Sequence, residues 1–169
     1  MLDKFLRSIV ATPLIIYTLR CFIGFLIGYE LYNRYPDFEL FWTLLSIILV
    51  ISPEEKDTRK LSIERFKSNL IGSAVAMGTL YFLGGTVYTI LLGIFLTILV
   101  CRIFKVMNMA RVALVALLVI MVTPHEVSFV EAPIYRCLSV GFGCLIGLLI
   151  VVLTSMVIRP LKRKYGIPY

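Results

Sequence analysis

The stretch Ser52–Gly72, S-P-E-E-K-D-T-R-K-L-S-I-E-R-F-K-S-N-L-I-G, ends one apolar run and begins the next. A related stretch lies at Thr123–Gly143, T-P-H-E-V-S-F-V-E-A-P-I-Y-R-C-L-S-V-G-F-G. With an offset of 71 and no gaps, six of the 21 positions are identical. Each stretch has [ST]-P-x-E, a polar connection, an arginine and a segment with small residues, in the same order. We interpret the pair as an internal repeat.

The composition indicates a membrane protein. Of the 169 residues, 60% are hydrophobic, whereas soluble domains have about 45–50%. A chain of this size has too much surface to bury that excess, so part of its solvent must be lipid. The net charge is +7, but the basic residues are clustered in a way that indicates membrane orientation rather than nucleic-acid binding.

The sequence contains no pattern typical of an enzyme or of a bound cofactor. The four cysteines lie in or beside apolar runs without metal-ligand spacing, and we interpret them as small apolar residues. No nucleotide loop or nucleophile constellation is present, so we expect neither catalysis nor a metal. The single histidine, His125, lies in a predicted loop, where it is usually solvated; a proton-linked role is the alternative.

Six apolar runs predict an all-α integral membrane protein with six transmembrane helices, since a span needs about 20 residues or somewhat fewer if sheltered. Residues 2–12 have a helical alternation and could lie along the membrane surface before Pro13. The second and fifth runs are short. The predicted runs are Ile9–Tyr32, Phe38–Ile51, Phe66–Leu83, Val87–Phe104, Ala110–Val122 and Ile134–Ile158.

Basic residues predict the topology. With the N-terminus on the inner side, the inner segments carry fourteen of the 17 basic residues. We therefore predict that both ends lie on the inner side of a bacterial inner membrane. The repeat offset spans three helices, an odd number. We therefore predict a single membrane domain, 1–169, built from two inverted repeats, 1–85 and 86–169. Inverted repeats recur in secondary transporters and some channels.

The two short runs, Phe38–Ile51 and Ala110–Val122, are equivalents in the two repeats and each ends at [ST]-P. Short or proline-interrupted segments at matching positions are a sequence pointer to a transport site. The alternative is that Pro53 and Pro124 mark helix ends in the headgroup region.

Arg65 and Arg136 each lie at the beginning of a predicted helix, where free backbone N–H groups favour anions. The alternative for both is snorkelling to the interface. Arg136 lies on the predicted outer side, against the positive-inside bias. It therefore needs an anion, or a pair with Glu126 or Glu131.

Arg20 lies within the first apolar run. A charge inside the membrane costs about 2.5–3.5 kcal/mol on insertion scales, so Arg20 should face protein or water. If the span begins only after Tyr17, Arg20 is instead an anchor at the inner interface.

Further candidates complete the predicted site. The glycines form small-xxx-small faces for helix packing, and the small polar residues could line a path or hydrogen-bond between helices. The predicted anion pathway comprises Arg20, Arg65, Arg136, Ser68, Ser139, Asn69 and Trp42; the predicted packing or hinge positions are Gly24, Gly28, Pro53, Gly72, Pro124, Gly143 and Gly147.

Several of these motifs together resemble the fusaric acid resistance or aromatic acid exporter family (FUSC-like). They are a helix-1 arginine, Phe41-Trp42, Ser52-Pro53, the Arg65…Gly72 spacing and the Ala132…Arg136…Gly143 spacing. The resemblance covers nearly the whole chain. It implies six helices and, as in the related plant aluminium-activated malate transporters, conduction of organic anions by dimers. It also implies that Arg20, Arg65 and Arg136 fall where the family keeps basic residues.

Members of that family usually follow the six helices with a soluble domain or a second membrane half, whereas this sequence ends about ten residues after the last run. A single six-helix unit implies a homo-oligomer, most simply a dimer. The function predicted is a permease or channel-like exporter for small organic, including aromatic, anions. The alternative is a non-transporting membrane subunit that anchors a soluble or membrane partner through its basic inner face.

Overall fold

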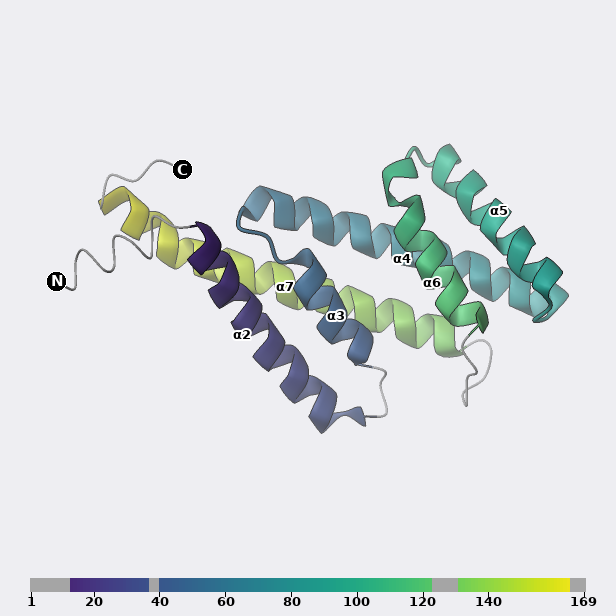
Figure 1. The fold of residues 1–169 in the computed structure, drawn as a ribbon, viewed down its shortest axis with the longest axis horizontal. Helices are drawn as coiled ribbons and strands as arrows, with labels where there is room; N and C mark the ends of the chain where they lie inside the picture. The colour runs from purple at the N-terminus through teal and green to yellow at the C-terminus, as the bar shows by residue number, and fades with distance from the viewer. Residues whose placement is uncertain (1–12, 37–39, 123–130, 165–169) are drawn as a thin grey trace. The chain divides into compact units, whose positions relative to one another are not determined.

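The computed structural model describes residues 13–36, 40–122 and 131–164. These residues form six α-helices and a short 3-10 helix, and they contain no strand (Figure 1). The predicted all-α class is confirmed. The chain divides into two compact units, which we call the first unit (Met1–Ser62 with Phe142–Tyr169) and the second unit (Ile63–Gly141).

The first unit contains α2 (Pro13–Arg34), α3 (Phe41–Val50) and most of α7 (Glu131–Lys164). Helix α2 begins at a proline, whose fixed φ suits the first helical position and whose missing N–H has no helical partner to lose. Helix α2 packs on α3, and side chains from α3, from the residue that follows it and from α7 form the core. This core consists of Ile47, Ile51, Ile150 and Val151.

The second unit contains most of α4 (Glu55–Leu83), with α5 (Val87–Ile103), η2 (Met107–Met109), α6 (Ala110–Val122) and the beginning of α7. Gly84, with φ of 73°, follows the end of α4 in the left-handed conformation that glycine adopts readily. Two clusters form the core: Ala76, Leu80, Leu117 and Ile120; and Cys101, Ala110 and Ala113.

Each unit combines two helices of one predicted repeat with the third helix of the other. In the first unit, a Cβ added to Gly143 of α7 would lie 2.8 Å from Ser46 Cβ of α3. In the second unit, a Cβ added to Gly72 of α4 would lie 2.8 Å from Ala116 Cβ of α6. The two glycines are 71 positions apart and their neighbours are 70 apart. Neither unit therefore consists of one half of the sequence. The two compact units are not the two repeats, and the repeat boundary at residue 85 stays a prediction.

Two predicted helix ends were wrong. Helix α4 begins at Glu55 rather than at Phe66, so the polar connection is largely helical. Acidic residues in its first turn suit a helix N-terminus, and Glu55 pairs with Arg59 one turn later. Helix α7 continues through Pro160 to Lys164; proline removes one backbone hydrogen bond, but the helix does not end there.

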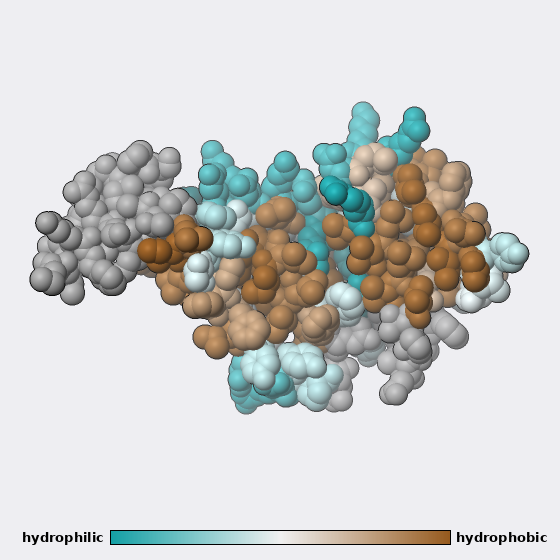
Figure 2. Space-filling model, in the orientation of Figure 1, coloured by the Kyte–Doolittle hydropathy of each residue, from teal (hydrophilic) through white to brown (hydrophobic). Residues whose placement is uncertain are grey.

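Two helical segments are long and apolar enough to cross a membrane by length and composition, namely Leu14–Arg34 and Pro133–Pro160. Shorter apolar helices cover Phe41–Val50, Val87–Ile103 and Met107–Val122. Large apolar side chains are widely exposed, including Phe22 at 65% and Phe95 at 62%, and Figure 2 shows hydrophobic residues over broad areas of the face in view. Such a surface suits lipid rather than water. The predicted surface segment at residues 2–12 lies outside the described residues.

Candidate functional site

Arg20 is buried in the first unit, where its side chain is 3% exposed. The prediction that it faces protein is therefore confirmed. Its Nη1 donates to the carbonyl oxygens of Ser52, at 2.8 Å, and Pro53, at 2.7 Å. Its Nε donates to Thr154 Oγ1 at 2.9 Å and its Nη2 donates to Ser155 Oγ at 2.8 Å. The planar guanidinium thus joins α2, α7 and the turn between α3 and α4.

The Ser52-Pro53 motif explains why two carbonyls are available to Arg20. Helix α3 ends at Val50, and Ile51 has extended backbone with ψ of 127°. The proline prevents the helix from continuing, so the carbonyls of Ser52 and Pro53 lack helical partners. A cation beyond a helix C-terminus also complements the helix dipole. We therefore interpret Arg20 as the group that caps the end of α3.

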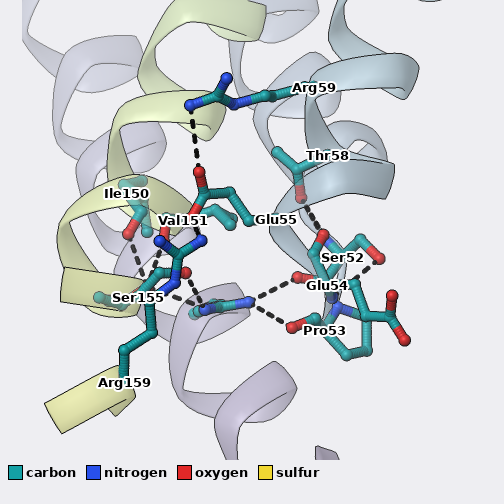
Figure 3. Close-up of polar contacts among 12 residues, drawn as sticks. Ser52, Pro53, Glu54, Glu55, Thr58, Arg59, Ile150, Val151, Ser155 and Arg159 are labelled. Carbon is teal, nitrogen blue, oxygen red and sulfur yellow. Dashed lines mark hydrogen bonds and ion pairs between the residues drawn. The ribbon is translucent and has the colours of Figure 1, made fainter. Parts of the chain in front are cut away.

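Side-chain hydrogen bonds shape the same turn (Figure 3). Ser52 N donates to Thr58 Oγ1 at 3.1 Å, and the Thr58 hydroxyl donates to the Glu54 carbonyl at 3.3 Å. On α7, Thr154 Oγ1 donates to the Ile150 carbonyl at 2.7 Å, which holds this hydroxyl in place as an acceptor for Arg20. Two of the residues that accept from Arg20, Ser52 and Thr154, are therefore also held by hydrogen bonds of their own.

A more exposed ion-pair cluster lies beside this turn. Glu55 accepts from Arg159 Nη2 at 2.6 Å and from Arg59 Nη2 at 3.1 Å. The arginine side chains are 59% and 63% exposed, whereas that of Glu55 is 14% exposed. The two carboxylate oxygens point to the two arginines (Figure 3). This cluster gives a second connection between the beginning of α4 and the end of α7, weakened by solvent.

Helices α4 and α7 approach each other in the second unit. A Cβ added to Gly141 of α7 would lie 3.0 Å from Phe66 Cε2 of α4. Cys137 of α7 lies close to the Asn69 side chain of α4. Phe66 and Cys137 are themselves equivalent positions at the repeat offset of 71. We call the residues around these two contacts the α4–α7 crossing.

Small polar side chains and an arginine are buried near the α4–α7 crossing. Arg136 and Ser139 of α7 are 4% and 6% exposed, and Ser68, Asn69 and Ser73 of α4 are between 1% and 4% exposed. Ser68 Oγ donates to the Arg65 carbonyl at 3.0 Å. The hydrogen-bonding atoms Asn69 Nδ2 and Ser73 Oγ have no hydrogen-bond partner in the described part of the chain. The cluster can therefore offer both a positive charge and neutral donors.

Arg65 does not lie at a helix beginning, contrary to the prediction. Helix α4 begins ten residues earlier, at Glu55, so all backbone N–H groups near Arg65 have helical partners. Arg136 lies in the second turn of α7, which begins at Glu131. Glu126, His125 and Pro124 lie outside the described residues, as does the side chain of Glu131.

A known protein family matches most of this sequence. Residues 10–150 match the family described as fusaric acid resistance protein-like. The chain belongs to this family. The resemblance seen in the sequence is thereby confirmed. No curated protein and no solved structure matches the chain. The fusaric acid resistance-like family is a family of membrane transport proteins rather than of enzymes.

In this fusaric acid resistance-like chain, the predicted pathway residues fall into two groups. Arg20 and Trp42 belong to the first unit, and Trp42 packs edge-on against Phe41 at 5.5 Å between ring centroids. The second unit contains the other five: Arg65, Ser68, Asn69, Arg136 and Ser139. That these side chains contact an anion stays a prediction.

The predicted packing glycines lie in close contacts between helices. Gly24 and Gly28 of α2 approach Ile47 of α3, and Gly147 of α7 lies against the Ile47 backbone. Added Cβ atoms at these glycines would lie 2.9, 3.2 and 3.2 Å from Ile47 atoms, respectively. With Gly143 against Ser46, α3 is thus enclosed on two sides by glycine faces.

Sequence reasoning missed the partners of Arg20 and the burial of Ser73. Thr154 and Ser155 are 134 and 135 residues away from Arg20, in a run read only as apolar. Two adjacent hydroxyl residues there were the available signal. Ser73 is not among the predicted site residues, although serine in an apolar helix is also a potential ligand. Within the described residues, no group of three His, Cys, Asp or Glu is placed to hold a metal.

Proposed function

We propose that this protein is a permease or channel-like exporter for small organic anions, aromatic carboxylates among them. In this proposal its six helices cross the bacterial inner membrane as two inverted repeats with both ends inside, and the chain acts as a homo-oligomer. The family supports the transport role. The equivalent contacts of Gly72 and Gly143 support the repeat, since each glycine packs on the short helix of the opposite repeat.

The observation that carries the anion assignment is the burial of Arg136 among small polar residues at the α4–α7 crossing. A buried arginine in a membrane span is costly and is usually kept for function. Guanidinium groups bind carboxylates in two-pronged geometry, and their charge persists at all physiological pH values. In this proposal Arg136 attracts the carboxylate while the side-chain amide of Asn69 offers neutral hydrogen-bond donors.

Arg20 has a different part in this proposal. Four of its hydrogen bonds go to protein acceptors within the first unit. We therefore assign it as a positioning residue that holds α2, α7 and the α3–α4 turn together. The related ion pairs of Glu55 reinforce the same junction at its exposed side.

The proposal is tested by anion flux in proteoliposomes, with fusarate and benzoate as probes. Arg136→Gln should lower the flux about tenfold or more, because a hydrogen bond to a charged group contributes about 1.5–3 kcal/mol. Arg136→Lys should retain part of the flux, since it keeps the charge but loses the fork. The matched control is Arg102→Gln, which removes an exposed arginine on α5.

Flux of the Arg136→Gln protein equal to that of the wild type, at equal reconstitution, would contradict the anion assignment. Wild-type protein that carries neither probe would favour the alternative, a membrane anchor for a partner chain. Size-exclusion chromatography with light scattering, in detergent, gives the oligomeric state independently of flux.

A further inference from the structure

Two buried polar side chains of α4 indicate a binding site, because helix packing gives their hydrogen-bonding atoms no partner. Asn69 and Ser73 are 3% and 4% exposed, and neither Asn69 Nδ2 nor Ser73 Oγ has a hydrogen-bond partner among the described residues. They are four positions apart, so they lie on one face of α4 with a rise of about 6 Å between them. Their apolar successors on that face, Ala76 and Leu80, belong to a packed core cluster.

The hydroxyl of Ser73, like that of Ser62 in the first unit, differs from the threonine hydroxyls within the helices. A serine or threonine in an apolar helix usually donates to the carbonyl four residues earlier. Thr79, Thr97 and Thr154 do so, with distances of 2.7–2.8 Å. Ser73 makes no such bond, although its backbone is equally helical. A buried polar atom normally has a partner, protein or water, so this hydroxyl is available to hydrogen-bond a further molecule.

The surroundings indicate what kind of molecule it is. The Nδ2 group of Asn69 only donates hydrogen bonds, and the serine hydroxyl can donate one. The Asn69 side chain lies beside Cys137, whose chain neighbour is the buried cation Arg136. Donors near a cation favour an oxygen acceptor over a metal ion.

We propose that Asn69 and Ser73 bind the oxygen atoms of a guest molecule at the α4–α7 crossing, with the Cys137 thiol at the edge of this site. The guest is water or the carboxylate of the transported anion, which share the same acceptor chemistry. Only the carboxylate form rests on the proposed function. In the water form, the site is a hydrated position within an otherwise apolar helix pair.

Cys137 provides a native probe of this site. In one protein Cys137 is the single cysteine, through Cys21→Ala, Cys101→Ala and Cys144→Ala. In the matched control Cys21 is kept instead, because both cysteines are partly buried but Cys21 packs against the apolar core of the first unit. Both proteins are placed in liposomes and treated with a negatively charged methanethiosulfonate, which reacts with hydrated thiolates and not with thiols facing lipid.

We expect Cys137 to react about tenfold faster than Cys21. Adding Asn69→Leu with Ser73→Ala to the Cys137 protein should lower its rate to that of Cys21, since the donors that hold the guest are lost. Equal rates for the two cysteines, or a rate at Cys137 unaffected by the double substitution, would overturn the proposal. If the double variant does not fold, Asn69→Ala alone should still slow the reaction, and an unchanged rate would again overturn it.

Benzoate separates the two guests. Protection of Cys137 by benzoate identifies the carboxylate, whereas labelling that depends on Asn69 and Ser73 but is indifferent to benzoate identifies water. The proposed function fails separately, through an absence of wild-type flux. Fast labelling of Cys137 without flux would therefore support this site while refuting the transport proposal.

Discussion

Replacing Arg20 by alanine should lower the free energy of unfolding of the protein, rather than act on anion transport directly. The arginine donates to the Ser52 and Pro53 carbonyls and to the hydroxyls of Thr154 and Ser155. Hydrogen bonds to charged groups contribute about 1.5–3 kcal/mol each, so the four together contribute roughly 6–12 kcal/mol before any cost is subtracted. Placing the charge in the membrane costs about 2.5–3.5 kcal/mol. With the lower hydrogen-bond value of about 6 kcal/mol, subtracting this cost leaves a net stabilisation of about 3 kcal/mol.

We therefore expect Arg20→Ala to lower the free energy of unfolding by about 3 kcal/mol or more, measured by titrating sodium dodecyl sulfate into mixed micelles. Arg20→Lys should lose less, because an ammonium still reaches the two carbonyls but lacks the planar fork. Arg159→Gln serves as the control for an exposed arginine at the same junction. It should cost less than about 1 kcal/mol, as exposed ion pairs do.

A loss of stability for Arg20→Ala within about 0.5 kcal/mol of zero, the range of ordinary surface substitutions, would refute the capping role. If the same protein then lost anion flux, Arg20 would instead belong to the pathway, as the sequence first suggested.

Two further predictions concern the helices themselves. Gly72→Ala and Gly143→Ala should each lower the free energy of unfolding by about 1–3 kcal/mol, because the new methyl group meets the backbone of α6 or α3. The control Gly78→Ala has open space around it, so its free energy of unfolding should stay the same or rise by up to about 1 kcal/mol. Equal effects at all three would contradict the packing. Pro160→Ala should restore a backbone hydrogen bond in α7 and slow amide exchange near Met156, whereas faster exchange there would show that the proline orders this turn.

The apolar helices were largely predictable because each one corresponds to a run of hydrophobic residues in the sequence. The run Ala110–Val122 has the same bounds in the sequence and in the structure. The beginning of α4 was not predictable in this way. Its first turns are charged, and a hydrophobic run marks the part of a helix that meets lipid, not the part that extends into water.

The candidate site was predictable in its residue types and not in its contacts. A single arginine in an apolar run indicated that Arg20 faces protein. Its acceptors could not be predicted, because two are backbone carbonyls and the others lie more than 130 residues away. Likewise, the offset of 71 related Gly72 to Gly143, but only the structure shows that each glycine packs on a helix of the opposite half.

Because each unit contains helices from both halves of the sequence, the order of synthesis determines which unit can be completed first. Helices α4, α5 and α6 are consecutive in the chain, so the core of the second unit can assemble soon after they leave the ribosome. Helices α2 and α3 are synthesised first, yet the α7 segment that packs on Thr43 and Ser46 arrives last. Until then the guanidinium of Arg20 lacks its hydroxyl acceptors, so the first unit stays incomplete until α7 has been made. The earliest helices to be made are thus the last to be completed.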